Sequence, residues 1–180
     1  MRKSIYISIL GGLAAILTLS IQTSAKSSMQ LFDLDSEWEK TTETMGIPDA
    51  MWNLKSNKEI YVTEMSHDLN SKKGEIKAGK TNEMLAEFTK GRNQALQLVG
   101  INDWHITDNK ITQENGQISM IIQGGFHDTN SKSVEFKEVH IWQKKKYRSL
   151  SVNYPSSSKF GEKSTQVINR FISSVNEGDK

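Results

Sequence analysis

Residues 104–127 read WHITDNKITQENGQISMIIQGGFH, and this stretch decides most of the fold. Asn115-Gly116 divides it into two strand-like runs, and Asn-Gly is the strongest short hairpin signal because both turn positions need a positive φ. The stretch therefore predicts strands 104–114 and 117–127, paired so that Ile111 faces Met120. Gly124-Gly125, late in the second strand, predicts a bulge or a close approach of another backbone.

A second predicted hairpin follows the first. Residues 134–143 and 147–154 are strand-like runs on either side of Lys144-Lys145-Lys146, and the second run alternates regularly between two sets of side chains. Pro155 and the serines at 156–158 end that strand and lead into a helix. The apolar stripe of this helix follows helical spacing and consists of Phe160, Val167, Ile168, Phe171, Ile172 and Val175.

The first half of the chain predicts two further strands and one helix. Alternation indicates strands at 51–54 and 59–65, and the polar, lysine-rich stretch 68–80 indicates a loop. Residues 81–99 predict a helix that Gly100 closes, with Met84 beside an apolar stripe of Leu85, Phe88, Ala95, Leu96 and Val99. This order of elements predicts an α+β fold, an antiparallel β-sheet with helices packed on it.

The first 25 residues have the pattern of a secretory signal peptide. Arg2 and Lys3 precede an apolar run at 5–21, and Thr23 and Ala25 suit the two small positions that signal peptidase reads. The pattern predicts cleavage between Ala25 and Lys26 and a periplasmic or extracellular protein without membrane insertion after cleavage. The alternative is an uncleaved anchor, although the run is shorter than the roughly 20 apolar residues that span a bilayer.

The remaining residues have the size of one domain. We expect a polar segment at 26–49 (an extended arm, a strand or a short helix), a single α+β domain at 50–176 and a tail at 177–180. The chain has 23 Lys and Arg against 21 Asp and Glu, and Arg2 and Lys3 account for the excess. The neutral balance argues against nucleic-acid binding. The absence of cysteine excludes disulfides, thiol catalysis and cysteine-ligated zinc.

The order of elements and several packing patterns resemble the PsbP-like family. The resemblance covers residues 51–175 and includes Phe136-Lys137-Glu138-Val139-His140-Ile141-Trp142, Arg148-Ser149-Leu150-Ser151-Val152-Asn153-Tyr154-Pro155 and the helix end at Phe171-Ile172-Ser173-Ser174. The family includes extrinsic proteins of photosystem II, a Ran-binding relative and exported bacterial proteins of the DcrB group. The resemblance implies an α/β/α-like sandwich and a non-enzymatic binding or assembly role, and it assigns no functional residue.

No motif marks a catalytic, cofactor or metal site. The histidines are His67, His105, His127 and His140. A hairpin turn centred near Ser131 would place His140 opposite Ile122, away from His127, as a structural residue beside Trp142. His127 with Asp128, or Asp103 with His105, are weak metal-binding pairs. The sequence therefore predicts no metal and no cofactor.

A calcium loop is rejected for the acidic N-terminal segment. Asp33, Asp35, Glu37 and Glu39 alternate as in such a loop, but Trp38 stands where the loop needs glycine and Thr44 where it needs a bidentate glutamate. Four tryptophans are candidates for a ligand groove, with core packing as the alternative: Trp38, Trp52, Trp104 and Trp142.

The densest positive cluster consists of Lys144, Lys145, Lys146 and Arg148. It is a candidate docking site for an acidic partner or an anionic lipid surface. The alternative is a solvated hairpin tip that protects against aggregation.

Three functions remain open at this point. The first is a non-enzymatic module that binds an unknown protein partner or supports an envelope assembly. The second is a carrier of a small molecule or lipid in a cleft between helix and sheet. The third is a hydrolase, which requires a histidine and a carboxylate that converge in a pocket.

The signal-peptide pattern generates the first testable prediction. We expect the protein recovered from outside the cytoplasm to begin at Lys26, as read by intact-mass spectrometry. A mature protein that retains Met1 would contradict cleavage and favour the anchor.

Overall fold

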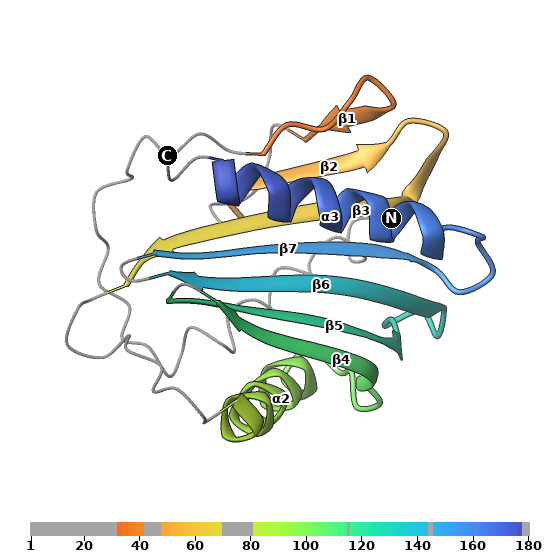
Figure 1. Cartoon of the computed structure of the whole chain (residues 1–180). Helices are drawn as coiled ribbons and strands as arrows, with labels where there is room; N and C mark the ends of the chain where they lie inside the picture. The colour runs from red at the N-terminus through yellow and green to blue at the C-terminus, as the bar shows by residue number, and fades with distance from the viewer. Residues whose placement is uncertain (1–31, 42–47, 70–80, 115, 144–145, 178–180) are drawn as a thin grey trace.

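The computed structural model describes residues 32–41, 48–69, 81–114, 116–143 and 146–177. Within these residues, seven antiparallel strands form one sheet in the order β1-β2-β3-β7-β6-β5-β4, as Figure 1 shows. The strands are β1 (Trp38–Lys40), β2 (Ala50–Leu54), β3 (Asn57–Asp68), β4 (His105–Glu114), β5 (Gln117–His127), β6 (Ser133–Gln143) and β7 (Lys146–Pro155). Helices α2 (Thr81–Gln97) and α3 (Gly161–Glu177) complete the predicted α+β fold.

The two helices cover opposite faces of the sheet, and each face has its own core. Successive side chains of a strand point to opposite faces, and β6 shows the consequence. Val139 and Ile141 pack in the cluster that contains Phe171 of α3, whereas Phe136 packs in the cluster that contains Phe88 of α2. The result is an α/β/α-like sandwich.

The predicted helix and turn signals are confirmed. Helix α2 buries Phe88, Ala95 and Leu96, and Gly100 follows it with a φ of 86°. Positive φ at this position is the usual way to end a helix, and glycine adopts it without steric cost.

The Asn-Gly hairpin has the predicted register, with Ile111 opposite Met120 and a φ of 78° at Gly116. The glycine pair of β5 also marks a close approach, because a Cβ on Gly124 would lie 1.9 Å from the carbonyl oxygen of His105. The irregularity itself lies in the partner strand, where the pairing shifts between Ile106 and Asp108.

The predicted pairing of His140 with Ile122 is wrong by two residues. His140 lies opposite Met120, and Ile122 lies opposite Glu138. The cause is the connecting turn, in which Ser131 adopts a φ of 61° and donates its backbone N–H to Asp128 O at 2.8 Å. This turn brings His127 opposite Ser133 and so moves its centre to residue 130.

The N-terminal segment joins the sheet as an edge strand after an extended stretch. Phe32 and Leu34 are buried against α3, and β1 pairs with β2. The backbone N–H of Phe32 donates to Glu64 Oε2 at 2.9 Å. Glu64 is fully buried and therefore ties the segment to the centre of the sheet.

Arg148 is buried, which corrects its assignment to the docking cluster. It is 9% exposed, pairs with Glu64 and lies 4.9 Å from the ring centre of Phe171. The reason is strand alternation, because Arg148 shares the α3 face with Leu150 and Val152. Lys146 is exposed, and Lys144 and Lys145 lie outside the described residues.

In the described part of the chain, neither helix has the length and apolar character needed to cross a membrane. The predicted signal peptide at 1–25 lies outside that part, as do residues 70–80 of the predicted loop at 68–80, whereas Asp68 is the last residue of β3.

Arg148 and Lys146 provide a matched test of the burial. Replacing Arg148 by Met should lower the free energy of unfolding by about 3–5 kcal/mol, because it leaves a buried carboxylate without its partner. Lys146→Met should change it by less than about 0.5 kcal/mol. Urea unfolding measures both, and equal small effects would restore Arg148 to the surface cluster.

Candidate functional site

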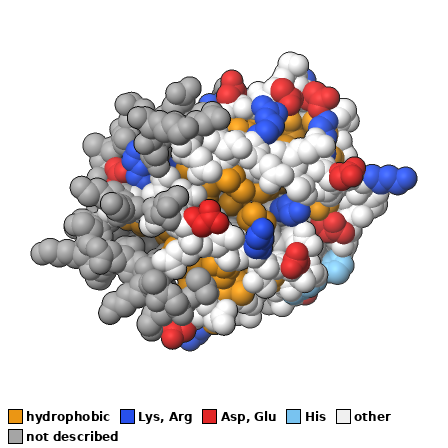
Figure 2. Space-filling model, viewed as in Figure 1, with side chains coloured by type: hydrophobic (Ala, Val, Ile, Leu, Met, Phe, Trp, Pro, Cys, Tyr) orange, Lys and Arg blue, Asp and Glu red, His pale blue; other side chains and the backbone are white. Residues whose placement is uncertain are grey.

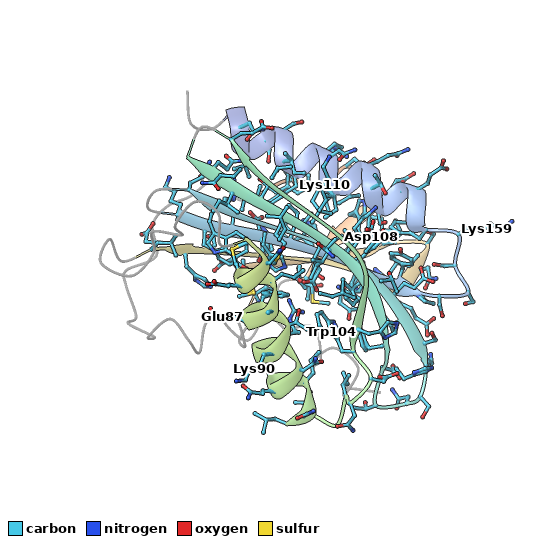
Figure 3. The ribbon with its side chains drawn as sticks, turned by 60° about the horizontal axis from the view of Figure 1, so that its bottom comes forward. Glu87, Lys90, Trp104, Asp108, Lys110 and Lys159 are labelled. Atoms are coloured by element: carbon cyan, nitrogen blue, oxygen red, sulfur yellow. The ribbon has the colours of Figure 1, made fainter. Side chains whose placement is uncertain are left out.

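A buried polar network joins α2 to the sheet. Arg92 of α2 makes two hydrogen bonds to Glu138 of β6, at 3.1 and 2.7 Å. The guanidinium carbon also lies over two aromatic rings, 5.1 Å from the ring centre of Phe88 and 5.6 Å from that of Trp104. Figure 3 shows Trp104 on one side of α2, and Glu87 and Lys90 on the other side of this helix, away from Trp104.

His140 extends this network to Tyr147. Its Nε2 donates to Glu138 Oε2 at 3.1 Å, and the Tyr147 hydroxyl donates to its Nδ1 at 2.7 Å. Burial lowers the pKa of His140, and Glu138 offsets this only in part, so the ring is neutral. Burial also raises the pKa of Tyr147 to about 12. A neutral His140 can donate from Nε2 and accept at Nδ1, and a Tyr147 that keeps its proton can donate to that Nδ1, so the pKa shifts agree with both hydrogen bonds.

Glu138 is the fixed charge of the network. Burial alone would raise its pKa, but the charge of Arg92 and the hydrogen bonds from His140 and Arg92 lower it to about 2. A cavity of about 20 Å³ lies beside Glu138 and His140, enough for about one water molecule. The network therefore holds α2 on the sheet and offers no room for a ligand.

A larger, open groove lies on the other face of the sheet, at the end where α3 begins. Its volume is about 520 Å³. Asp103 and four strands line it, and Gly161 at the first turn of α3 closes one side. In Figure 2, histidine and acidic side chains lie next to one another at the corresponding right-hand end of the molecule.

One row of cross-strand neighbours forms the floor of the groove. His105, Gly125, Glu135 and Tyr154 follow one another across β4, β5, β6 and β7. A Cβ on Gly125 would lie 3.2 Å from the carbonyl oxygen of Val134 and 3.7 Å from Cε1 of His105. The missing side chain thus leaves the middle of the row open.

Asp103 orients both histidines of the groove. His127 donates from its backbone N–H to Asp103 Oδ1 at 3.0 Å and from its ring Nδ1 to Oδ2. His105 Nδ1 donates to the carbonyl oxygen of Asp103 at 2.8 Å. Slight burial would raise the pKa of Asp103, but the hydrogen bonds from His127 outweigh it and lower the pKa.

The structure separates the four histidines into two pairs. His140 belongs to the α2 network, where His67 stacks on Tyr147 with ring centres 6.0 Å apart. His105 and His127 line the groove. Asp128, which formed a weak metal-binding pair with His127 in the sequence, accepts the backbone N–H groups of Asn130 and Lys132 and so closes the turn. Within the described residues, no three His, Asp or Glu side chains are close enough to hold a metal ion.

The other candidates from the sequence lie elsewhere. Trp38, Trp52 and Trp104 are core residues, and Trp142 packs at the edge of the α2 core, so none lines the groove. Three acidic residues of the N-terminal segment form ion pairs with basic side chains of other elements: Asp35 with Arg170, Glu37 with Lys163 and Glu39 with Lys58.

The low pKa of Glu138 makes stability depend on pH. A carboxyl whose folded-state pKa is lowered adds stability above its unfolded pKa and loses it as the pH falls. Between about pH 6 and pH 2, the unfolding free energy of the wild type should fall by about 3 kcal/mol more than that of Glu138→Gln. Urea unfolding across this range measures the difference, and parallel profiles would show that Glu138 carries no fixed charge.

Comparison with known proteins supports the fold. No protein-family model matches the chain, and no curated protein matches it in sequence. Among solved structures, the chain is similar to cyanobacterial PsbP (CyanoP) from Synechocystis sp. PCC 6803, with a TM-score of 0.60 and 12% identity over 78% of this chain and 81% of that one. The fold is therefore PsbP-like, and the narrower resemblance to the DcrB group stays a prediction.

Proposed function

We propose that this protein is an exported, non-enzymatic binding module and that the groove at the start of α3 is its binding site. The observation that carries the proposal is the open row across four strands, in which Gly125 leaves a gap between polar side chains. The groove volume of about 520 Å³ lies within the usual range of ligand sites, about 300–1,000 Å³.

The arrangement of the histidines suits recognition. Both rings have Nδ1 held by Asp103, which leaves each Nε2 available to a ligand. A ring that is already oriented loses little conformational freedom when it binds. The α3 side of the groove is equally well anchored, because Val167, Ile168 and Phe171 fix that helix in the core. A preformed site on a stable sheet is expected of a protein that holds a partner or a small ligand.

A hydrolase is the second candidate, and one observation favours it. The Asp103–His127 pair resembles the oriented imidazole of a general base, and Ser133 lies directly opposite His127 on the same face. This arrangement meets the condition that a histidine and a carboxylate converge in a pocket.

Filling the groove should weaken binding. We expect the immobilised full chain and a Lys90→Glu control on the outer side of α2 to retain the same molecule from an envelope extract of the source cells, detected by mass spectrometry. Gly125→Val should retain about tenfold less, because its side chain occupies the gap in the row. Circular dichroism checks that the three proteins are equally folded.

Two results would contradict the proposal. One is equal retention by all three proteins. The other is hydrolysis of p-nitrophenyl acetate that disappears in both His127→Ala and Ser133→Ala, which would make the protein a hydrolase.

A further inference from the structure

We propose that the groove recognises a cationic nitrogen group, an ammonium or a guanidinium, and this inference rests on the binding role proposed above. The group would be presented by a basic side chain of a protein partner or by a free amine. The inference follows from which atoms of the groove are acceptors.

The hydrogen bonds of Asp103 determine the tautomer of both rings. A carbonyl oxygen can only accept, so His105 Nδ1 carries the proton in its 2.8 Å contact with Asp103 O. The ionised carboxylate of Asp103 likewise accepts from His127 Nδ1. In a neutral imidazole with a proton on Nδ1, Nε2 is an acceptor. Both histidines therefore present acceptors to a ligand.

Glu135 adds a negative charge on the opposite side of the gap. Glu135 is exposed, and in the described part of the chain it has no basic partner, whereas Glu37, Glu39 and Glu59 each pair with a lysine. Tyr154 is a neutral hydrogen-bond partner of Glu135, and burial together with the charge and the hydrogen bond of Glu135 raises the pKa of Tyr154. A basic group from outside would supply the missing partner.

The one lysine among the groove-lining residues is already engaged. Lys137 donates from Nζ to Thr165 Oγ1 of α3 at 2.7 Å. The positive end of the α3 dipole also borders the groove at Gly161, and Glu162 in the first turn offsets it. Lys137 keeps its positive charge, so Asp103 and Glu135 together leave the groove with an excess of one negative charge.

The spacing of the acceptors favours a group with several donors over a single ion. His105 and Glu135 are two strands apart, which separates their backbones by about 9–10 Å. Among the described residues, no three potential ligands converge on one point. A guanidinium, with five N–H donors in a plane, or an ammonium on a flexible stem can reach acceptors on both sides of Gly125.

The test uses amide NMR spectra of the full chain with four small probes at neutral pH. We expect acetyl-Gly-Arg-Gly-amide to shift the amides of residues that line the groove, and acetyl-Gly-Glu-Gly-amide to leave them unchanged. Glu135→Gln should weaken binding of the arginine peptide about tenfold. Glu87→Gln is the matched control, because Glu87 is an exposed carboxylate on the opposite face (Figure 3).

Agmatine and acetyl-Gly-Lys-Gly-amide distinguish the source of the cation. Tighter binding of the two basic peptides supports a protein partner, and tighter binding of agmatine supports a free amine. Stronger groove shifts with the glutamate peptide would overturn the cation assignment and leave the binding role in place. The absence of groove shifts with every probe would also overturn it, and the Gly125→Val capture experiment then decides the binding role separately.

Discussion

The end of the sheet that carries the groove depends on the absence of side chains at two adjacent positions of β5. A Cβ on Gly124 would lie 1.9 Å from the carbonyl oxygen of His105, so β4 can approach β5 this closely only at a glycine. Gly125, on the other face, leaves the gap between His105 and Glu135. Gly124 therefore allows the close approach of β4, which borders the groove, and Gly125 leaves the floor of the groove open.

The irregularity of β4 decides which side chains reach this groove. With the register of Ile111 and Met120 continued without a shift, His105 would lie opposite Phe126. The shift at Thr107 instead places His105 opposite Gly125. Because a slip of one residue moves a side chain to the other face, this bulge brings Asp103, His105 and His127 together.

Much of the fold was predictable because its signals are local. The Asn-Gly turn, the alternating strands and the helical stripes each depend on neighbours in sequence, and all were confirmed. The groove was not predictable, because it depends on a one-residue bulge at Thr107 and on the turn at residues 128–132. The sequence placed the centre of this turn at residue 131, whereas the structure has it at residue 130. Arg148 shows an intermediate case. Its alternation with Leu150 and Val152 indicated the core face, yet its partner Glu64 is 84 positions away in the chain.

The buried ion pairs and the proposed binding groove lie in separate parts of the molecule. Each face of the sheet contains a buried Arg–Glu pair, Arg148 with Glu64 beneath α3 and Arg92 with Glu138 beneath α2. Removing one partner of such a pair is strongly destabilising, so both pairs constrain how the elements pack. The groove lies outside these networks, and its polar side chains take no part in either pair.

The protonation of the two groove histidines is the most direct measurement of the central claim. Nitrogen-15 chemical shifts of the imidazole rings report which ring nitrogen carries the proton in the neutral form. The account predicts the Nδ1–H tautomer for both His105 and His127, and loss of this preference at His127 in Asp103→Asn. An Nε2–H tautomer at both rings of the wild type would present donors to the groove and would contradict the account.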